Sequence, residues 1–284
     1  LRLIADQGRD AFYEGPVAES IVDAVQSDGG LMTMEDLASF DVSYRTPVTS
    51  TYRGYEIISV PPPSSGGAHV IQLLNIMENF DLEKMGLNSA QSIHAWAKAM
   101  KLMYSDRADY MGDSDFIEVP LKGLTSKEYA RDQFARIDMQ SVMNLPPSGD
   151  PWIEESSSTT HFSVVDRHGN MVAYTKTINH FFASGITTPG TGIVLIDEMF
   201  DFDMDIQSAI NTPRINNYDS GPLKIESRIP AEVQNELLQM GHELQVKMDF
   251  DLYFGGAQGV VIDQKSGVMH GGADPRRDGK AIGY

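Results

Sequence analysis

The feature that most constrains this chain is a predicted β-hairpin whose first strand is headed by two threonines. The run Thr159–Asn170 opens with Thr159 and Thr160 and continues as a strand, and a second strand is predicted over Met171–Asn179. Ahead of the hairpin, Asp150–Ser158 is mostly polar and lacks apolar periodicity, which predicts an exposed loop. A loop that leads into such a strand suits self-cleavage, because the freed α-amine can serve as the threonine's own base.

The pairing within this hairpin decides which threonine faces the returning strand. A turn about His168-Gly169 predicts that Phe162 faces Thr175 and that Thr160 faces Thr177. A different turn would shift the register by one residue, so Thr159 and Thr160 both remain candidate partners of Thr177. Facing threonines are also common as purely structural pairs in strands.

Length and composition are those of a globular protein. The chain has 284 residues, of which 41% are hydrophobic and 22% charged, enough for one large domain or two small ones with a buried core. No stretch approaches the 18 or more uninterrupted apolar residues of a membrane span. The first residues, Leu1–Ile4, are neither an initiator methionine nor a signal peptide, so we expect a fragment or a processed product.

Cysteine content and charge exclude several functions. There is no cysteine, which excludes disulfides, thiolate catalysis and cysteine-ligated metal sites but does not fix the compartment. The formal net charge of −18 argues against nucleic acid as a partner, because phosphate binding requires clustered lysine and arginine. An anionic substrate would need a local cationic group to hold it.

Periodicity predicts a helix-rich first half and a strand-rich second half. Helices are predicted over Pro16–Val25, Met34–Phe40, Ser64–Phe80, Ser89–Gly112, Lys127–Ile137, Asp205–Ile210 and Ala231–Met240. Strands are predicted over Tyr52–Val60, Thr160–Asp166, Met171–Asn179, Gly192–Asp197, Leu223–Glu226, Gly259–Asp263 and Val268–Gly271. This order predicts an α+β fold with helices layered on stacked antiparallel sheets.

Other candidate sites have weaker patterns. Asp201, Asp203 and Asp205 alternate as in a calcium loop, but Ile206 stands where glycine is needed and Thr212 where the bidentate glutamate should be. His161 and His168 lack a third metal ligand. Gly255–Gly259 precedes no helix and is interpreted as a bend, and Ser64–Gly67 is interpreted as a helix cap rather than an anion site.

Several motifs together resemble the γ-glutamyltranspeptidases, which are N-terminal-nucleophile hydrolases. The matching motifs run in one order almost from end to end: Pro61–Gly67, Asp106–Asp113, Thr159–Asn170 and Ala273–Arg276. The resemblance implies a four-layer αββα sandwich and no cofactor. It also implies that the precursor cuts itself between Ser158 and Thr159, giving a large-subunit part over 1–158 and a small, catalytic part over 159–284, both within one domain.

The resemblance also implies a reaction and a set of site residues. Thr159 would attack the γ-carbonyl of a γ-glutamyl compound such as glutathione, and water or an amino-acid or peptide amine would then take the γ-glutamyl group. Thr177 matches the threonine that orients the nucleophile, and Asn179 matches a substrate-binding asparagine. Glu198 and Asp201 match the acids that hold the substrate's α-ammonium. Family members are usually secreted, periplasmic or bound to the cell surface.

Two pieces that the family pattern requires are missing from this sequence. The N-terminal stretch with the arginine that binds the substrate's α-carboxylate is absent, and an internal gap falls near 203–206. The second gap removes the Pro-Leu-Ser-Ser-Met motif and the adjacent glycines of the oxyanion hole. We therefore expect this chain to consist of joined parts of a longer protein. Related cephalosporin acylases, poly-γ-glutamate depolymerases and a catalytically silent member of the family remain alternatives.

Overall fold

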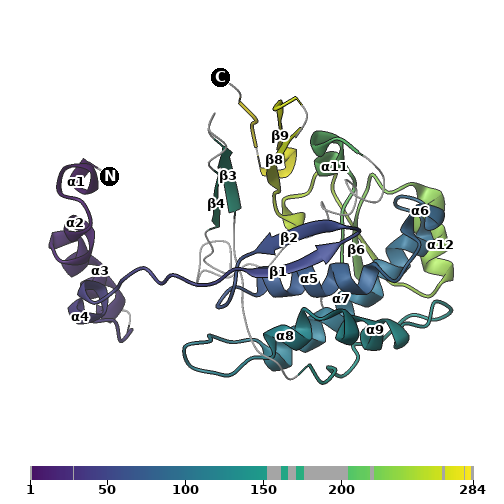
Figure 1. Ribbon diagram of the computed structural model, residues 1–284, viewed down its shortest axis with the longest axis horizontal. Coiled ribbons are helices and arrows are strands. Elements are labelled where there is room, and N and C mark those ends of the chain that lie inside the picture. The colour runs from purple at the N-terminus through teal and green to yellow at the C-terminus, as the bar shows by residue number, and fades with distance from the viewer. Residues whose placement is uncertain are drawn as a thin grey trace. The chain divides into compact units, whose positions relative to one another are not determined.

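The computed structural model describes residues 2–27, 29–151, 161–165, 171–175, 204–217, 221–263, 266–277 and 279–282 (Figure 1). The chain divides into two compact units, Leu1–Thr46 and Pro47–Tyr284. Among the described residues, no helix is both long and apolar enough to cross a lipid bilayer.

The first unit consists of short helices. They are α1 (Arg2–Gln7), α2 (Asp10–Tyr13), α3 (Pro16–Ser27) and α4 (Met34–Ala38). Proline at the first position of α3 suits the helical φ angle and lacks only an N–H that would have no partner there. Thr33 and Asp36 form a capping box at the start of α4. Both predicted helices of this region are confirmed, and their apolar faces meet at Ala18, Val22 and Leu37.

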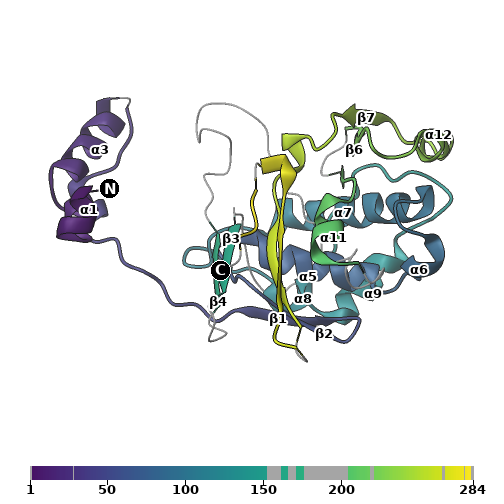
Figure 2. The ribbon, with the colours of Figure 1, turned by 90° about the horizontal axis from the view of Figure 1, so that it is seen from above.

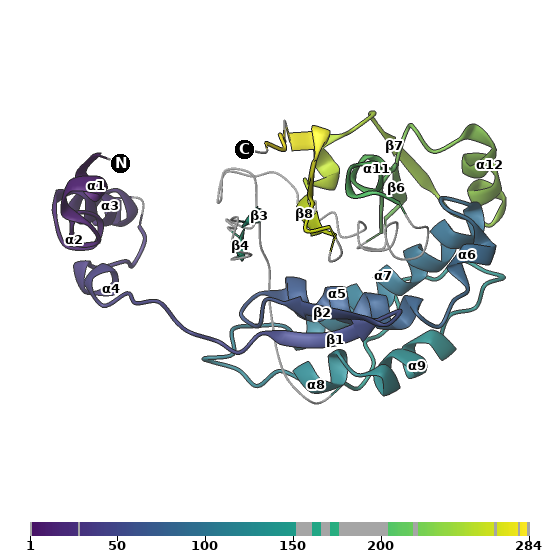
Figure 3. The same cartoon turned by 45° about the horizontal axis from the view of Figure 1, so that its top comes forward.

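The second unit begins with a two-stranded ribbon packed on a helix. Strands β1 (Val48–Tyr52) and β2 (Tyr55–Ser59) pair in antiparallel register and lie against α5 (Ser65–Met77) (Figure 3). The strand predicted over Tyr52–Val60 is confirmed over Tyr55–Ser59 as β2, but its predicted start is wrong, because Arg53 and Gly54 turn the chain. Both residues have positive φ angles, 50° and 87°, as a two-residue hairpin turn requires.

Two further helices, α7 (Ala90–Tyr110) and α9 (Lys127–Ala135), pack with α5. Two short helical turns, α6 (Leu82–Met85) and α8 (Leu121–Leu124), accompany them, and Figure 2 shows α5 and α7 side by side. The predicted apolar stripe of α7 is buried through Met100, whereas Ala108 in its last turn is exposed. The helices predicted from Ser64, Ser89 and Lys127 are thus confirmed within a few residues.

The strand-rich half contains a three-stranded sheet that mixes directions. Its strands are β5 (Ile215–Asn216), β6 (Leu223–Glu226) and β7 (Leu244–Lys247), with α12 (Ala231–Gln239) between the last two. β5 and β6 are antiparallel, but β6 and β7 are parallel. The purely antiparallel prediction is wrong here, because a strand–helix–strand connection returns the second strand in the same direction.

Two hairpins complete the described fold. Strands β3 (His161–Val165) and β4 (Met171–Thr175) pair with each other, as do β8 (Gln258–Ile262) and β9 (Met269–Ala273). β3 lies beside β8, while α11 (Ile206–Asn211) packs on β8 and β9. The short 3-10 helices η1 (Leu252–Phe254) and η2 (Pro275–Arg277) flank the second hairpin.

Glycines allow α11 to approach the second hairpin closely. A Cβ added at Gly259 would lie 2.7 Å from Ile206 Cδ1, and one added at Gly272 would lie 2.6 Å from Ile210 Cδ1. Both distances are too short for real carbon contacts, so larger residues would force α11 off the strands. Taken with the elements described above, the mixture of helices and sheets predicted from the sequence is confirmed.

Candidate functional site

The register of the β3–β4 hairpin differs by one residue from the register expected for a turn about His168-Gly169. Phe162 pairs with Tyr174 rather than with Thr175, and His161 is the partner of Thr175. The reason is the length of the connection: Val165 pairs with Met171, which leaves an odd number of connecting residues, whereas a two-residue turn needs an even number. The alternative register that the sequence left open is therefore the observed one.

The residues predicted for catalysis and substrate binding lie outside the described part of the chain. They are Ser158, Thr159, Thr177, Asn179, Glu198 and Asp201. Thr160 and the strand predicted over Gly192–Asp197 also lie outside it. The structure describes residues that precede and follow these positions in the sequence. Three of the four family-like motifs lie within the described residues: Pro61–Gly67, Asp106–Asp113 and Ala273–Arg276.

The first two motifs meet around a buried carboxylate on α7. Asp106 is fully buried, and its Oδ2 accepts hydrogen bonds from Gln72 Nε2 at 2.5 Å and from Tyr129 OH at 2.8 Å. Its Oδ1 accepts from the Gly149 N–H at 2.8 Å. Ser65, at the start of α5, accepts a hydrogen bond from Arg107 Nε at 3.3 Å. The Asp106 cluster therefore ties α5, α7 and α9 to the segment that leads toward Ser158.

Burial sets the protonation of the Asp106 cluster. Desolvation raises the pKa of Asp106, and the hydrogen bonds from Gly149, Tyr129 and Gln72 act against that rise. Burial, together with the neighbouring Asp106 carboxylate, raises the pKa of Tyr129, which keeps its hydroxyl as a donor. The cluster is thus held by donors aimed at one carboxyl group.

His69 extends this cluster into α5. Its Nδ1 lies 2.8 Å from Gln72 Oε1, an atom that can only accept, so Nδ1 carries the proton. Burial lowers the pKa of His69 to about 4, which keeps the ring neutral. Among the described residues, its buried Nε2 has no hydrogen-bond partner. Sequence reasoning missed His69 and the role of Asp106; the signal available was a polar residue within the buried part of a predicted helix.

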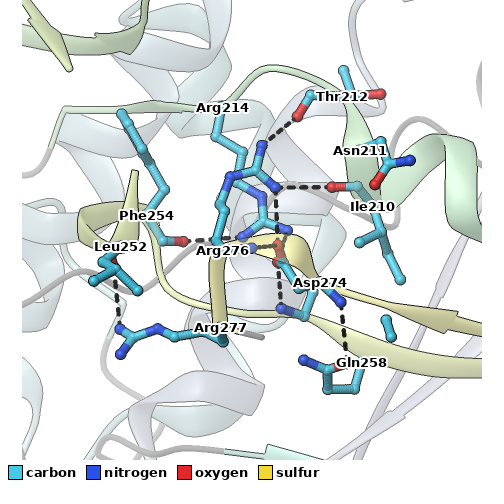
Figure 4. A network of polar contacts seen from close by, with 12 residues as sticks. Ile210, Asn211, Thr212, Arg214, Leu252, Phe254, Gln258, Asp274, Arg276 and Arg277 are labelled. Carbon is cyan, nitrogen blue, oxygen red and sulfur yellow. Dashed lines mark hydrogen bonds and ion pairs between the residues drawn. The ribbon is translucent and has the colours of Figure 1, made fainter. Parts of the chain in front are cut away.

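The fourth motif, Ala273–Arg276, forms a buried ionic network (Figure 4). Arg214 donates to Asp274 Oδ2 at 2.5 Å, and Arg276 donates to Asp274 Oδ1 at 3.2 Å. Arg276 also forms a two-point ion pair with Glu226 on β6, and one of these contacts, Nη2 to Oε2, measures 2.9 Å. These four side chains have at most 1% of their surface exposed.

Backbone groups complete this network. Arg276 donates to the carbonyl oxygens of Ile210 at 2.9 Å and Thr212 at 2.8 Å, while the Ala257 N–H donates to Asp274 Oδ2 at 2.7 Å. The network therefore joins the end of α11, strand β6 and the turn after β9. All four carboxylate oxygens of Asp274 and Glu226 accept hydrogen bonds within the network, which makes it a structural support rather than a ligand site.

The described residues offer no metal site. No group of three or more histidine, aspartate or glutamate side chains within the described ranges could hold an ion. Asp205, the last acid of the alternating series, caps α11 by accepting from the N–H groups of Gln207 and Ser208, each at 3.0 Å. Asp201, Asp203 and His168 lie outside the described residues, as do the side chain contacts of His161.

Curated relatives match nearly the whole chain. A glutathione hydrolase proenzyme of Bacillus subtilis is 32% identical over 355 aligned positions, covering 99% of this chain and 60% of the relative. A glutathione hydrolase proenzyme of Escherichia coli is 46% identical over 71% of this chain and 35% of the relative. An acylase ACY 1 proenzyme of a Pseudomonas strain is 30% identical over 99% of this chain. The chain thus spans about 60% of the length of the Bacillus relative.

The alignment to the Bacillus relative is longer than this chain. Its 355 positions exceed the 284 residues by 71, so the relative has at least 71 aligned residues with no counterpart here. The solved structure of a cephalosporin acylase from Bacillus halodurans has the same fold, with a TM-score of 0.84 and 24% identity over the whole chain and 62% of that structure.

The sequence profile described as gamma-glutamyltranspeptidase matches this chain in two overlapping parts, residues 1–204 and 196–284. Together these matches span every residue, and they overlap at residues 196–204. This chain belongs to the gamma-glutamyltranspeptidase family.

Proposed function

We propose that this chain is part of a self-processing γ-glutamyl transferase and hydrolase that cleaves γ-glutamyl amides such as glutathione. Support comes from the family profile and from the Bacillus and Escherichia relatives, which are named glutathione hydrolase proenzymes. The enzyme needs no cofactor. Its partners are a γ-glutamyl small molecule and, for transfer, an amino-acid or peptide amine.

The register of β3 and β4 supports Thr159 as the nucleophile. His161 pairs with Thr175, and two further steps outward along both strands lead to Thr159 and Thr177. Directly opposed residues of an antiparallel pair point to the same face of the ribbon, within reach of a hydrogen bond between hydroxyls. If this register is continued beyond His161 and Thr175, Thr159 rather than Thr160 becomes the partner of Thr177. The pairing of His161 with Thr175 is the observation on which the assignment rests.

The proposed reaction begins with the peptide bond between Ser158 and Thr159. Its cleavage frees the α-amine of Thr159, which takes the proton of the Thr159 hydroxyl as its oxygen attacks the γ-carbonyl carbon. The amide nitrogen leaves with a proton, and an acyl-enzyme remains. Water then releases glutamate, or an amine takes the γ-glutamyl group. Thr177 orients the nucleophile in this scheme.

Substrate binding is assigned to three further residues. Asn179, two residues after Thr177 in the sequence, is assigned to contact the substrate. Glu198 and Asp201 present carboxylate oxygens to the α-ammonium group, which has three N–H donors to satisfy. In a chain of net charge −18, these acids would favour a cationic amine over a second anionic group.

We further propose a four-layer αββα sandwich divided into two subunits. Residues 1–158 belong to the large subunit, and residues 159–284 form the small, catalytic subunit. An internal gap near 203–206 corresponds to residues that the relatives possess, and the break in the profile match at 196–204 supports this position. The missing segment would supply the oxyanion hole, whose donors each contribute about 3 kcal/mol to such reactions.

A second candidate function is a related acylase. The Pseudomonas relative is named an acylase, and the structure with the same fold is a cephalosporin acylase. The two functions differ in whether the acyl group carries an α-amine. A γ-glutamyl anilide and the matching glutaryl anilide, which lacks only that amine, separate them by the ratio of kcat/KM values.

The experiment that tests the proposal compares wild-type full-length protein with Thr159→Ala. We expect two fragments on denaturing electrophoresis and release of aniline from the γ-glutamyl anilide for the wild type. The variant should give one band and no turnover, because it lacks the attacking oxygen. A single band for the wild type would instead indicate a catalytically silent member of the family, and a split Thr159→Ala chain would assign the nucleophile to another residue.

A further inference from the structure

The segment that precedes the proposed cleavage point runs along α7. Four side chains of α7 contact residues 143–149, at positions that lie on one side of the helix. Lys101 Nζ donates to Met143 O at 2.8 Å, Ser105 Oγ to Pro146 O at 2.6 Å, and Tyr110 OH to Gly149 O at 2.6 Å. Ser148 Oγ donates to Asp109 Oδ2 at 2.6 Å. Lys101, Ser105 and Asp109 are spaced four residues apart, so they form one stripe.

Two further side chains, the buried Asp106 and the partly exposed Arg136, hold the same segment. Asp106 accepts the Gly149 N–H at 2.8 Å, and Arg136, at the end of α9, donates to Pro147 O at 2.5 Å. Four carbonyl oxygens of the segment thus receive side-chain donors. An extended stretch rich in proline cannot satisfy these groups with its own N–H groups, so the helices do so instead.

Two glycines show how closely the segment is fitted. A Cβ added at Gly149 would lie 2.1 Å from both Tyr129 OH and Gln133 Nε2. A Cβ added at Gly123 on α8 would lie 1.9 Å from the Pro151 carbonyl oxygen. Neither φ angle is positive, so glycine is needed at both positions for space rather than for backbone conformation. The segment is therefore held up to Pro151.

We propose that this arrangement, which we name the α7 clamp (Lys101, Ser105, Asp106, Asp109 and Tyr110 holding residues 143–151), positions the chain for its own cleavage. The inference rests on the proposed function, because it assumes scission between Ser158 and Thr159. With Pro151 held by the clamp and His161 paired in β3, nine residues connect two fixed points. The scissile bond lies within these nine.

The number of residues between the two fixed points determines how much the clamp should speed self-cleavage. Without the clamp, the fixed point nearest the cut would recede to Ala135 at the end of α9, and the connection would grow from nine to 25 residues. The probability of bringing chain ends together falls with roughly the 3/2 power of loop length, which gives about a fivefold loss. An intramolecular reaction slows by the same factor as the population of its reactive arrangement. The clamp residues are thus positioning residues for the cut.

After the cut, the clamp has no such role in turnover. It then retains a tail of seven residues, 152–158, whose fully extended reach from Pro151 is about 25 Å. The new α-amine and hydroxyl belong to Thr159, on the other side of the broken bond. Weakening the clamp should therefore slow processing without changing catalysis by molecules that have already split.

The test uses the full-length protein with Gly149→Ala and Gly123→Ala, which act as wedges at two separate points. Gly15→Ala is the matched control, because its added Cβ meets nothing closer than 3.8 Å. The first-order rate of splitting is followed by denaturing electrophoresis from freshly synthesised precursor. We expect both wedges to split more slowly than the control, with about fivefold, the loss for a segment freed back to Ala135, as the upper limit, and kcat/KM per split molecule within about twofold of wild type.

The outcomes separate this inference from the proposed function. A wild type that never splits overturns the proposed function itself. A wild type that splits together with wedges that match the control overturns the clamp alone. The clamp is also overturned if Gly149→Ala and Gly123→Ala split slowly and their split molecules lose kcat/KM by the same factor. Such a result would mean that the substitutions distort the protein generally. Thermal melting of each variant completes this comparison, and a slow split with an unchanged melting temperature supports positioning.

Discussion

Asp106 and Arg276 show two ways in which this chain holds buried charge. Asp106 is surrounded by neutral donors, so burial raises the pKa of its carboxyl group. Arg276 is instead paired with two carboxylates and two carbonyl oxygens. Both residues belong to motifs that suggested the family, yet both support the fold around the proposed site. Motif membership alone does not distinguish a support from a catalytic group.

Replacing Arg276 with methionine should destabilise the protein strongly. The change leaves Glu226 and Asp274 buried with fewer partners, and breaking a buried ion pair typically costs about 3–5 kcal/mol. Urea unfolding on the uncut Thr159→Ala background measures this loss for a single chain. Arg131→Met is the control, because Arg131 and Glu128 are 62% and 76% exposed and their pair should matter little. Equal losses for the two variants would contradict the assigned role of the network.

Glu198→Ala and Asp201→Ala should weaken binding of substrates that carry a free α-amine. Loss of a charge-assisted hydrogen bond costs about 1.5–3 kcal/mol, which corresponds to a rise in KM of roughly 10- to 100-fold. The control is the glutaryl anilide, whose KM should not change because it has no ammonium group. Steady-state kinetics with both anilides measures the difference. An unchanged KM for the γ-glutamyl anilide would remove these acids from the site.

At the scale of elements, helices were predictable where apolar periodicity was long. α3, α5, α7, α9 and α12 begin or end within a few residues of their predicted bounds. Strand β2 was predicted, but its partner β1 and the turn between them were not, because Arg53-Gly54 is an unusual turn pair and the alternation of residues continues across it. β5 was missed because two residues give too little pattern, and β7 because its residues are mostly half-buried or exposed and its partner β6 lies before α12 in the sequence.

The candidate site could be predicted only in part, because its contacts join residues far apart in the sequence. Thr159 and Thr177 could be related by strand pairing, but the register depended on a turn whose length the sequence did not reveal. The Asp106 cluster joins residues 72, 106, 129 and 149, which are contributed by three helices and a loop. No local pattern specifies such a meeting, because it is created by tertiary packing.

A buried histidine pair links α7 to the connection between α12 and β7, and it predicts a pH-dependent stability. His94 Nδ1 lies 2.7 Å from His242 Nε2, and burial lowers the pKa of each ring to about 4. Lys98 opposes protonation of both rings, and Asp138 favours it in His94. The unfolded chain binds these protons near pH 6.5, so stability is complete above that pH and is lost as the pH falls toward 4.

Unfolding measured from pH 7 to pH 4.5 tests this dependence. The free energy of unfolding should fall across the range by a few kcal/mol in the wild type. His242→Asn should be less stable at pH 7 and should show a shallower slope, because one of the three histidines whose pKa burial lowers (His69, His94 and His242) no longer titrates. His270→Asn, which replaces an exposed histidine, is the control. An unchanged slope in His242→Asn would show that the pair does not set the pH dependence.

At the scale of the whole molecule, the described supports lie on both sides of the proposed cleavage point in sequence. The α7 clamp ends at Pro151, and the pairing of β3 begins at His161. On the other side, the ionic network of Asp274 and Arg276 joins α11 and β6 to the turn after β9. The proposed enzyme therefore depends on one event between these supports, the formation of a new N-terminus.

The identity of that N-terminus is the most direct test. Full-length protein is purified, its fragments are separated, and the smaller one is sequenced from its amino end while both are weighed by mass spectrometry. We predict that the smaller fragment begins with Thr159 followed by Thr160 and His161. An intact chain, or a smaller fragment that begins at any other residue, would contradict the proposed nucleophile.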